Sequence, residues 1–380
     1  MKIARIDVTP LRVPLKEPYY WSHGVLDAAE TVLVAIHTDA GITGFGEAMS
    51  CGGGHATQAF LEAAGRIAVS RDPFAINALL ADIYAQLFAT RGNLGGRRFA
   101  ATVLAGLDMA LWDIAGKAAG RPLHALLGGA MRDEIAYFGF PQGGEPEQIA
   151  RSAQTWVERG AEVIYVKVGR GDDLDHAIVR AVRAAIGDRR LRVDANEAWD
   201  VLTARRMIRR LAPYDIEFLE QPTPSASLQA LKAVRAHSPI PIAADQIAYA
   251  PEDVLALCRE SAADLIVIGL HEAGSVAKFR ECAAIAAAAG INICLHGLYE
   301  TGISTCASLH AAAVIANLDD GNQFMNHLLV EDVIQGSALA LERGRLPLLT
   351  GPGLGFELDW DAVGRAHERH RAHYGERTGQ

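Results

Sequence analysis

Five ionisable residues recur along the chain at a regular interval, each at the end of a short apolar run. They are Lys167, Asp194, Glu220, Asp245 and His296, with separations of 27, 26, 25 and 51 residues. A strand, its returning helix and two short loops take roughly 25 to 30 residues, so the last separation is about two such steps. The carboxyl ends of the strands in a (β/α) barrel meet at one rim, where barrel enzymes place their active sites. The spacing therefore predicts one site at the mouth of a barrel.

The three acidic members of this series predict a metal site. Asp194, Glu220 and Asp245 would converge from adjacent strands, and three carboxylates cannot all stay ionised at close range without a cation. Oxygen-only ligation favours Mg²⁺ over Mn²⁺. Zinc is disfavoured because no histidine or cysteine joins the cluster at ligand spacing. The alternative is that the three are ordinary strand-end or helix-capping acids.

Lys167 and His296 are candidates for proton transfer on either side of this metal site. A lysine in a barrel mouth near a metal can act as a general base, because desolvation and neighbouring cations lower its pKa. Histidine suits proton transfer near neutral pH. The alternatives are a salt bridge for Lys167 and a hydrogen-bonded rim position for His296. Together with the metal, the pair suits removal of a proton α to a carboxylate.

Composition narrows the class of protein. The chain has 380 residues, of which 50% are hydrophobic and 21% charged, so one large barrel plus a smaller domain is expected. The formal net charge of −9 argues against a nucleic-acid partner. Five scattered cysteines without C-x-x-C spacing indicate reduced thiols in an intracellular protein. No secretory signal or membrane span is evident, so we expect a cytoplasmic protein without membrane association.

The order of expected elements changes once along the chain. Residues 1–50 alternate as antiparallel strands with a D-A-G turn, interrupted by PYYWSHG at 18–24, which we interpret as a loop. A second loop, SCGGGHA, covers 50–56, and residues 55–127 are mostly helical, with Gly120 ending a long helix. From about residue 134 the pattern becomes alternating strands and helices. An α+β domain followed by an α/β barrel is predicted.

Motifs along nearly the whole chain resemble the enolase superfamily, and more closely its mandelate racemase/muconate-lactonizing branch. They are GITGFGEA, GLDMALWDIAGKAAGRPLHALLGG, KVG, VDANEAW, EQP, the Ala244–Asp245 pair, LHG and PGLGFELD. The resemblance implies a modified (β/α)7β TIM barrel with an N-terminal α+β capping domain. We expect the cap over residues 1–128, the barrel over 129–345 and a segment returning to the cap over 346–380.

The resemblance also implies roles for individual residues. Asp194, Glu220 and Asp245 match the Mg²⁺ ligands, and Lys167 matches the second lysine of the family's K-x-K motif, the base. Asn196 and Gln246 match positions around the metal ligands. The two cap loops would close over a small carboxylate substrate, and their candidate contacts are Tyr20, Trp21, His23 and His55. Members of the family commonly form dimers or octamers, so a homo-oligomer is expected.

The chain departs from the family pattern at three places. Tyr165 replaces the first lysine of K-x-K. The aspartate that orients the histidine in mandelate-racemase-like members, or the lysine of the muconate-lactonizing type, corresponds to Gly269. His271 could substitute as a contact in the barrel mouth, with Glu272 and Glu300 as alternative partners for His296. The glutamate often found at the last strand has no counterpart, and Asn322 or Gln323 falls nearest.

Several outcomes of the proton transfer stay open from the sequence. Racemisation or epimerisation is slightly favoured, because a base is available on both faces. Dehydration of a hydroxy acid or sugar acid would use His296 as the acid, and cycloisomerisation ranks third. A non-catalytic scaffold is opposed by the intact triad and Lys167. A metal-dependent hydrolase is opposed by the absence of histidine from EIAYFGF.

Overall fold

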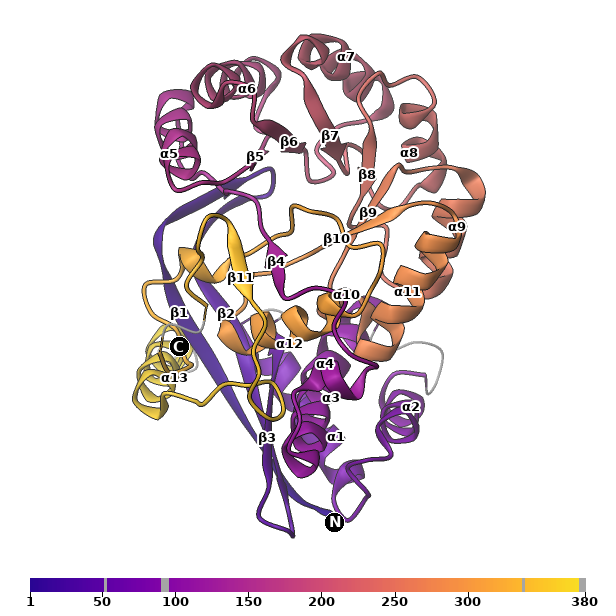
Figure 1. Ribbon diagram of the computed structural model, residues 1–380, viewed down its shortest axis with the longest axis vertical. Helices are drawn as coiled ribbons and strands as arrows, with labels where there is room; N and C mark the ends of the chain where they lie inside the picture. Colours follow the sequence, from indigo (N-terminus) through magenta and orange to yellow (C-terminus); the bar gives the residue numbers. More distant parts are fainter. Residues whose placement is uncertain (51–52, 90–95, 337–338, 376–380) are drawn as a thin grey trace.

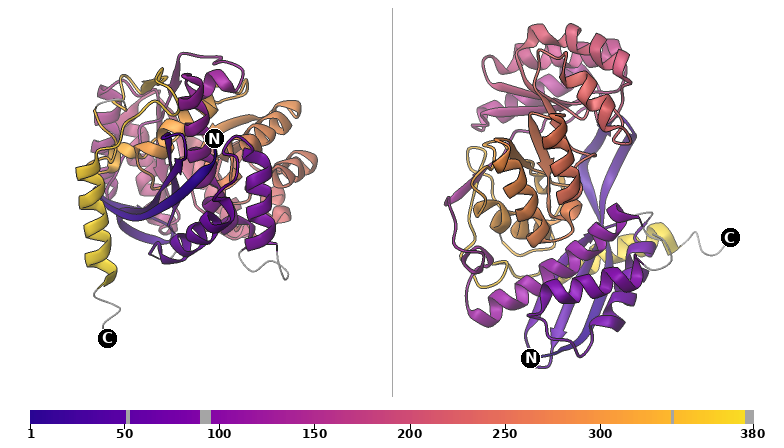
Figure 2. Two further views of the ribbon diagram at one scale, coloured as in Figure 1. Left: turned by 90° about the horizontal axis from the view of Figure 1, so that it is seen from below. Right: turned by 90° about the vertical axis from the view of Figure 1, so that its right-hand side faces the viewer.

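The computed structural model describes residues 1–50, 53–89, 96–336 and 339–375. Figure 1 shows a cap of strands and helices below a barrel, and Figure 2 shows the barrel helices on the outside of its strands. The last helix, α13 (Trp360–Gly375), returns to pack along the first strand of the cap, as the left view of Figure 2 shows. The four described cysteines form no disulfide, and Cys51 lies outside the described residues.

The cap begins with a three-stranded antiparallel sheet in the order β1-β2-β3. Its strands are β1 (Ile3–Trp21), β2 (Gly24–Thr38) and β3 (Thr43–Met49). The D-A-G turn joins β2 to β3 as predicted, with Gly41 at a φ of 79° that favours glycine. The expected alternation thus produces the sheet, whose apolar face packs on the cap helices.

The interpretation of PYYWSHG as a loop is wrong. β1 continues to Trp21 and pairs with the start of β2, with Tyr19 opposite Leu26 and Trp21 opposite Gly24. The register shifts between Pro14 and Tyr19, which hides the regular alternation from a sequence reading. The result is a long hairpin whose end reaches the barrel beside β5 (Figures 1 and 2). There the Ser22 hydroxyl donates to the Asn196 carbonyl at 2.9 Å.

Four helices follow the cap sheet, of which α1 and α3 pack on its strands. They are α1 (His55–Ala68), α2 (Ile76–Leu87), α3 (Arg97–Ala119) and the short α4 (Leu123–Leu126). Gly120 ends α3 in the left-handed conformation, as predicted. Strand β3 approaches α3 so closely that a Cβ on Gly46 would lie 2.0 Å from the Gly106 carbonyl oxygen. Within the described ranges α3 is the one helix whose length and apolar composition suit a membrane span, but it is mostly buried inside the protein.

The barrel is built on a six-stranded parallel sheet in the order β5 to β10. The strands are β5 (Val163–Lys167), β6 (Arg190–Asp194), β7 (Ile216–Glu220), β8 (Ile242–Ala244), β9 (Leu265–Ile268) and β10 (Asn292–Leu295). Bridges from Gly139 to Ile164 and from Tyr137 to Asn322 join the two edges through the segments at 137–139 and 322. The short β4 (Glu134–Ala136) pairs with β11 (Arg345–Pro347). This is the modified TIM barrel with an N-terminal cap that the sequence predicts.

Helices alternate with these strands, and each returns the chain so that the next strand runs parallel. They are α5 (Pro146–Glu158), α6 (Asp172–Ile186), α7 (Val201–Leu211), η1 (Ala212–Tyr214), α8 (Leu228–Arg235), α9 (Pro251–Glu260), α10 (Leu270–Ala273), α11 (Val276–Ala288), α12 (Gly302–Ala313) and η2 (Asn326–Leu328). Every residue of α12 is buried, and it contacts β3 of the cap. The barrel interior on β6 holds the fully buried Arg192, whose guanidinium pairs with Glu217 and Asp319.

Candidate active site

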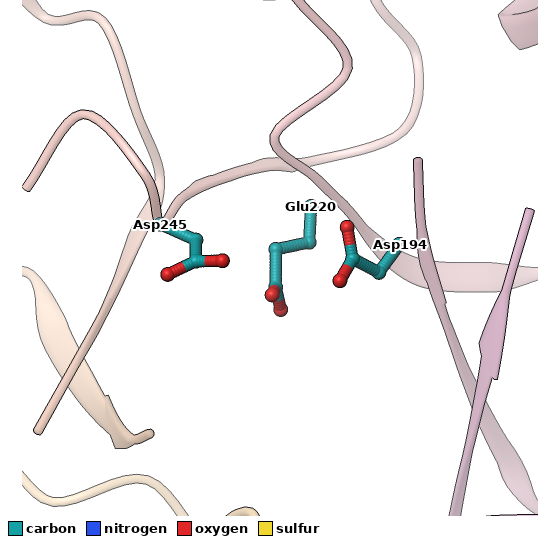
Figure 3. A group of neighbouring side chains, drawn as sticks. All are labelled: Asp194, Glu220 and Asp245. Atoms are coloured by element: carbon teal, nitrogen blue, oxygen red, sulfur yellow. The ribbon is translucent and has the colours of Figure 1, made fainter. Parts of the chain in front are cut away.

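The predicted metal ligands meet at the carboxyl ends of three neighbouring strands. Asp194 ends β6 and Glu220 ends β7 directly opposite it in register, while Asp245 follows β8 by one residue. Figure 3 shows the three carboxylates gathered around one space. Each offers an oxygen, and these oxygens lie within 4.8 Å of one another. All three side chains are buried.

The electrostatics of this cluster favour a bound cation. Burial and repulsion from Asp194 and Asp245 raise the pKa of Glu220 well above its usual range. Burial, together with repulsion from Asp194, raises the pKa of Asp245 to about 7, although His296 opposes the shift. Asp245 Oδ2 is buried and accepts no hydrogen bond from the described part of the chain. Three carboxylates that offer only oxygen atoms, one of them without a hydrogen-bond partner, fit a hard divalent cation such as Mg²⁺.

Lys167 lies beside this cluster at the end of β5. Its Nζ is 2.5 Å from Asp194 Oδ2, and Lys167 and Asp194 are opposite each other in the strand register. Burial opposes protonation of the amine, but attraction to Asp194 and Glu220 outweighs it and raises the lysine pKa. The salt bridge that the sequence offered as the alternative is therefore present, and it links the candidate base to a candidate metal ligand.

Tyr165 occupies the position of the first lysine of the K-x-K motif and lies within hydrogen-bond distance of two of the carboxylates. Its hydroxyl lies 2.6 Å from Asp194 Oδ2 and 2.8 Å from Glu220 Oε1, and its ring stacks on Phe138 with centroids 4.3 Å apart. A phenol supplies one hydrogen-bond donor without a charge. Tyr165 thus positions two of the carboxylates without adding a second amine to this face.

His296 has an orienting partner that is not at position 269. Its Nδ1 lies 2.8 Å from Glu272 Oε1 and 3.6 Å from Asp245 Oδ1. Burial opposes protonation of the imidazole, but Asp245 and Glu272 outweigh it and raise the His296 pKa to about 10. A Cβ on Gly269 would lie 2.5 Å from the His296 carbonyl oxygen, so a larger residue does not fit there. The carboxylate therefore reaches His296 from α10, where Glu272 Oε2 also accepts a hydrogen bond from Gly269 N at 2.9 Å.

Two other expected partners of the site lie elsewhere. His271 is buried beside Ser304, whose hydroxyl is 2.9 Å from its Nε2, and burial lowers its pKa to about 4. Glu300 accepts a hydrogen bond from Leu298 N at 3.1 Å and lies 3.9 Å from His271. Neither side chain bonds to His296, so the expectation that His271 or Glu300 assists it is wrong. The chain leaves the strand at Gly269 and enters α10. The alternation of side chains between the two faces of a strand therefore no longer predicts where His271 points.

A cavity of about 180 Å³ adjoins these groups, and only some of the predicted substrate contacts line it. Lys167, Asp245 and His296 line it, and so do Asn196, Gln246 and Gln323. Asn322 does not line it, because its amide instead bonds Leu295 N and the Ala136 carbonyl and so joins the barrel edges.

Of the cap residues selected from the sequence, only Trp21 lines this cavity. His23 is exposed and packs edge-on against the Trp21 ring. Tyr20 faces a neighbouring hollow and carries the Arg170 guanidinium 5.2 Å from its ring centroid. His55 is the first residue of α1 and packs on His370 and Tyr374 of α13. Of the loop at 50–56, Cys51 and Gly52 lie outside the described residues.

Sequence reasoning missed three tyrosines in the wall of the cavity: Tyr19, Tyr249 and Tyr299. Tyr19 had a signal, because residues two apart on a strand share a face and Trp21 is two residues away. That signal was lost once 18–24 was interpreted as a loop. Tyr249 and Tyr299 lie beyond the strand ends in connections whose direction the sequence does not show.

Comparison with known proteins agrees with this geometry. Residues 148–362 match the family described as enolase C-terminal domain-like. Residues 4–128 match the N-terminal domain of the mandelate racemase/muconate lactonizing enzyme family. The two matches together cover most of the chain and include all five residues of the original series.

Characterised relatives are similar over most of their length. Muconate cycloisomerase 1 of Rhodococcus opacus is 32% identical over 96% of this chain and 98% of its own. The hydrophobic dipeptide epimerase of Enterococcus faecalis is 32% identical over 84% of this chain and 89% of its own. The structure of a dipeptide epimerase from Enterococcus faecalis with Mg and the dipeptide L-Leu-L-Tyr has a TM-score of 0.85 and 28% identity, covering 94% of this chain and all of that one. Cycloisomerases and epimerases are both isomerases, and this chain is an enzyme of the mandelate racemase/muconate lactonizing branch of the enolase superfamily.

Proposed function

We propose that the protein removes the α-proton of a small carboxylic acid with the help of Mg²⁺, through an enediolate, and returns a proton to the opposite face. The reaction would be a racemisation or epimerisation. The observation that carries the proposal is that Lys167 and His296, the two proton-transfer candidates, line one cavity together with Asp245. The epimerases among the relatives, one of them bound to Mg and a dipeptide, support the same chemistry.

The metal would be held by Asp194, Glu220 and Asp245. Asn196 and Gln246 would lie next to these ligands. Bound Mg²⁺ would neutralise the negative charge that develops on the substrate carboxylate as the proton leaves. Tyr165 keeps two of the ligands in place through its hydroxyl. The Tyr165 hydroxyl and the Asn196 N–H therefore position part of the proposed ligand set, together with the Lys167 ammonium on Asp194.

Lys167 would take the proton on one face. Its ammonium is held by Asp194 at 2.5 Å, and this attraction favours the protonated form. Lys167 can therefore act as a base only when the charge of Asp194 is neutralised. Once that attraction weakens, burial of the amine lowers its pKa toward the range in which it accepts a proton.

His296 would serve the other face. Glu272 accepts from Nδ1 and so leaves Nε2 as the nitrogen that can exchange a proton with a substrate. Because Glu272 and Asp245 stabilise the imidazolium, His296 is well suited to donate a proton. In a racemisation, His296 would donate its own proton to the opposite face of the intermediate, while Lys167 keeps the proton that it has removed.

Dehydration is the second candidate function. The raised pKa of His296 favours an acid that could protonate a departing hydroxyl, which a dehydratase needs. Cycloisomerisation is a third outcome, supported by the muconate cycloisomerase among the relatives. Racemisation and dehydration both begin with removal of the proton next to the carboxylate and differ in the fate of the intermediate, whereas a ring-closing cycloisomerisation adds a proton at that carbon.

Incubation of candidate acids in D₂O with Mg²⁺ distinguishes these outcomes. Racemisation gives α-deuterium with an intact carbon skeleton, whereas dehydration gives a 2-keto product, and NMR detects both. We expect Lys167→Ala to abolish the reaction. Lys232→Ala is the control, since Lys232 pairs with Glu260 on the surface. Full activity of Lys167→Ala would rule out its assignment as the base.

Two further expectations stay predictions. The domain limits at residues 128 and 345 and a homo-oligomer, dimer or octamer, follow from the resemblance alone. Light scattering after gel filtration measures the assembly. A monomer at micromolar concentration would contradict the expected homo-oligomer.

A further inference from the structure

A groove outside the catalytic cavity lies between helix α5 and the end of strand β1. Its volume is about 780 Å³, and ligand sites commonly measure about 300–1,000 Å³. Lys16, Arg151 and Arg159 line it, and Glu17 is the one acidic residue among its described lining. Three cations and one carboxylate leave an excess of two positive charges, in a chain whose formal net charge is −9. The groove is therefore a positively charged site on an acidic protein.

The groove and the catalytic cavity lie on opposite faces of one strand. Successive side chains of a strand point to opposite sides, and Tyr20 lines the groove whereas Tyr19 and Trp21 line the cavity. The two spaces share no described lining residue. The hollow between them measures only about 10 Å³, and it adjoins the groove at Phe140 and the cavity at Lys167. A ligand in the groove would therefore lie outside the space of the proposed reaction.

The three cations of the groove are not neutralised by carboxylates. Lys16, Arg151 and Arg159 form no ion pair within the part of the chain that the structure describes. Lys16 Nζ donates to the His327 carbonyl at 2.8 Å, and the Arg159 guanidinium lies 5.8 Å from the Trp156 ring centroid. An ammonium has three N–H groups and a guanidinium five. Most of the charged donors in the groove are therefore available to a ligand.

The positions of these cations suit an elongated ligand. Arg151 lies on α5 and Arg159 directly follows this helix. The two are 159 − 151 = 8 residues apart, which is about 12 Å along a helix, and residues at this spacing share one face. Burial, with the charges of Lys16 and Arg159 acting in the same direction, lowers the pKa of His327 to about 3. Lys16 and Arg159 thus lie close to the same neutral imidazole.

Neutral donors supplement the cations. Ser152 Oγ accepts a hydrogen bond from Gln142 N at 3.1 Å, so its own proton is available to a ligand. The side-chain oxygen of Gln148 accepts from Gly144 N at 3.1 Å, which leaves its NH₂ group as a donor. The side-chain groups that stay free in the groove are therefore mainly donors. A phosphate group carries about −1.5 to −2 charges and three acceptor oxygens, and it matches such a lining better than a carboxylate does.

We propose that this groove binds a phosphate chain, either free or as part of a nucleotide, with Lys16, Arg151 and Arg159 as its charged contacts. Arginine can bind two phosphate oxygens at once through parallel N–H groups, and lysine adds a point charge. The ligand would lie along α5, beside the outer face of the strand that carries Tyr19 and Trp21 to the cavity. The inference does not depend on the proposed function, because none of the three cations lines the catalytic cavity.

Calorimetric titration of the full chain in EDTA tests the site, with inorganic tripolyphosphate as the probe. EDTA removes divalent cations, which would otherwise bind the probe and link it to the acidic cluster. We expect Arg151→Gln and Arg159→Gln each to weaken binding by about 10-fold or more, because each removes hydrogen bonds between charged groups. Arg209→Gln is the matched control, since it removes the same charge from an exposed arginine of α7 that does not line the groove.

Two further probes identify the chemistry of the ligand. ATP carries the same phosphate chain on a nucleoside. Tighter binding of ATP than of tripolyphosphate would identify a nucleotide, and weaker binding would identify a free phosphate chain, so both results support the phosphate assignment. Citrate offers three carboxylates in place of phosphates. Tighter binding of citrate than of tripolyphosphate and of ATP would overturn that assignment.

Four results would overturn the site itself. They are an absence of binding at millimolar tripolyphosphate, unchanged binding in both groove variants, an equal weakening in Arg209→Gln, and a loss of binding in Lys167→Ala. The last result would place the probe in the catalytic cavity. Arg151 and Arg159 are both exposed, so we expect the melting temperatures of their variants to match that of the unsubstituted protein. Arg151→Lys keeps the charge and should recover part of the lost binding.

Discussion

Replacement of Glu272 by glutamine tests whether this carboxylate holds His296 for proton transfer. Glu272 Oε1 lies 2.8 Å from His296 Nδ1, and Oε2 accepts from Gly269 N at 2.9 Å. Glutamine has one acceptor oxygen, so one of these two donors loses its partner. A hydrogen bond to a charged group contributes about 1.5–3 kcal/mol. Since 1.36 kcal/mol is a tenfold change in rate, we expect proton transfer through His296 to slow by about 10- to 150-fold.

The assay follows each enantiomer of one substrate separately in D₂O. One enantiomer presents its α-proton to Lys167 and the other to His296, so the initial exchange rate of each reports on one base. We expect Glu272→Gln to slow exchange of the enantiomer that faces His296 and to leave exchange of the other close to that of the unsubstituted enzyme. Interconversion of the enantiomers should slow in both directions, because each requires both groups.

Glu300→Gln is the matched control. Burial raises the pKa of Glu300 well above its usual range, which favours the neutral form that glutamine resembles in shape and charge. Its oxygen accepts from Leu298 N and makes no bond to His296 in the described structure. We expect both exchange rates to persist. An equal loss on both faces in Glu272→Gln, an intact rate on the His296 face, or the same selective loss in Glu300→Gln would refute the assignment.

Three other predictions concern the metal site and stability. In EDTA near pH 8 we expect Glu220→Gln to raise the melting temperature, because burial and neighbouring carboxylates penalise the charged glutamate. The same variant should no longer be stabilised by Mg²⁺. A lower melting temperature in EDTA would contradict the electrostatic account. Burial raises the pKa of Asp108 to about 7, so the fold binds more protons than the unfolded chain and loses stability as the pH rises from about 4 to 7. Urea unfolding should show Asp108→Asn gaining up to about 4 kcal/mol relative to the unsubstituted protein across this range, and a constant difference would exclude the effect. Gly46→Ala should destabilise the cap, because its Cβ would lie 2.0 Å from the Gly106 carbonyl oxygen. The control is Gly364→Ala on α13, whose Cβ would meet nothing within 4 Å and which should stabilise its helix by about 0.5–1 kcal/mol. Equal shifts of the melting temperature in the two variants would show that the close approach at Gly46 does not matter.

Most of the barrel and its acidic cluster could be predicted because they follow from local periodicity. A residue at the end of each parallel strand is brought to the same rim by the repeat of strand and helix. Lys167, Asp194 and Glu220 accordingly lie opposite one another in the strand register.

The errors occur where that periodicity stops. The register shift between Pro14 and Tyr19 concealed the hairpin that carries Tyr19 and Trp21 to the cavity. His55 was expected over the substrate, but the chain has already entered α1 at that residue. Strand parity predicted His271 in the barrel mouth, whereas the helical turn of α10 places Glu272 there. In each case a change of secondary structure redirects side chains within one or two residues.

The sequence by itself determined which chemical groups the site contains: three carboxylates, a lysine and a histidine at the ends of barrel strands. Their spacing is local, because each belongs to one strand-and-helix repeat. Only the tertiary structure decided that Glu272 orients His296 and that neutral aromatic side chains from the cap and the barrel connections enclose the cavity. Those contacts join segments far apart in the chain, and they depend on packing distances such as the one that leaves no room for a side chain at Gly269.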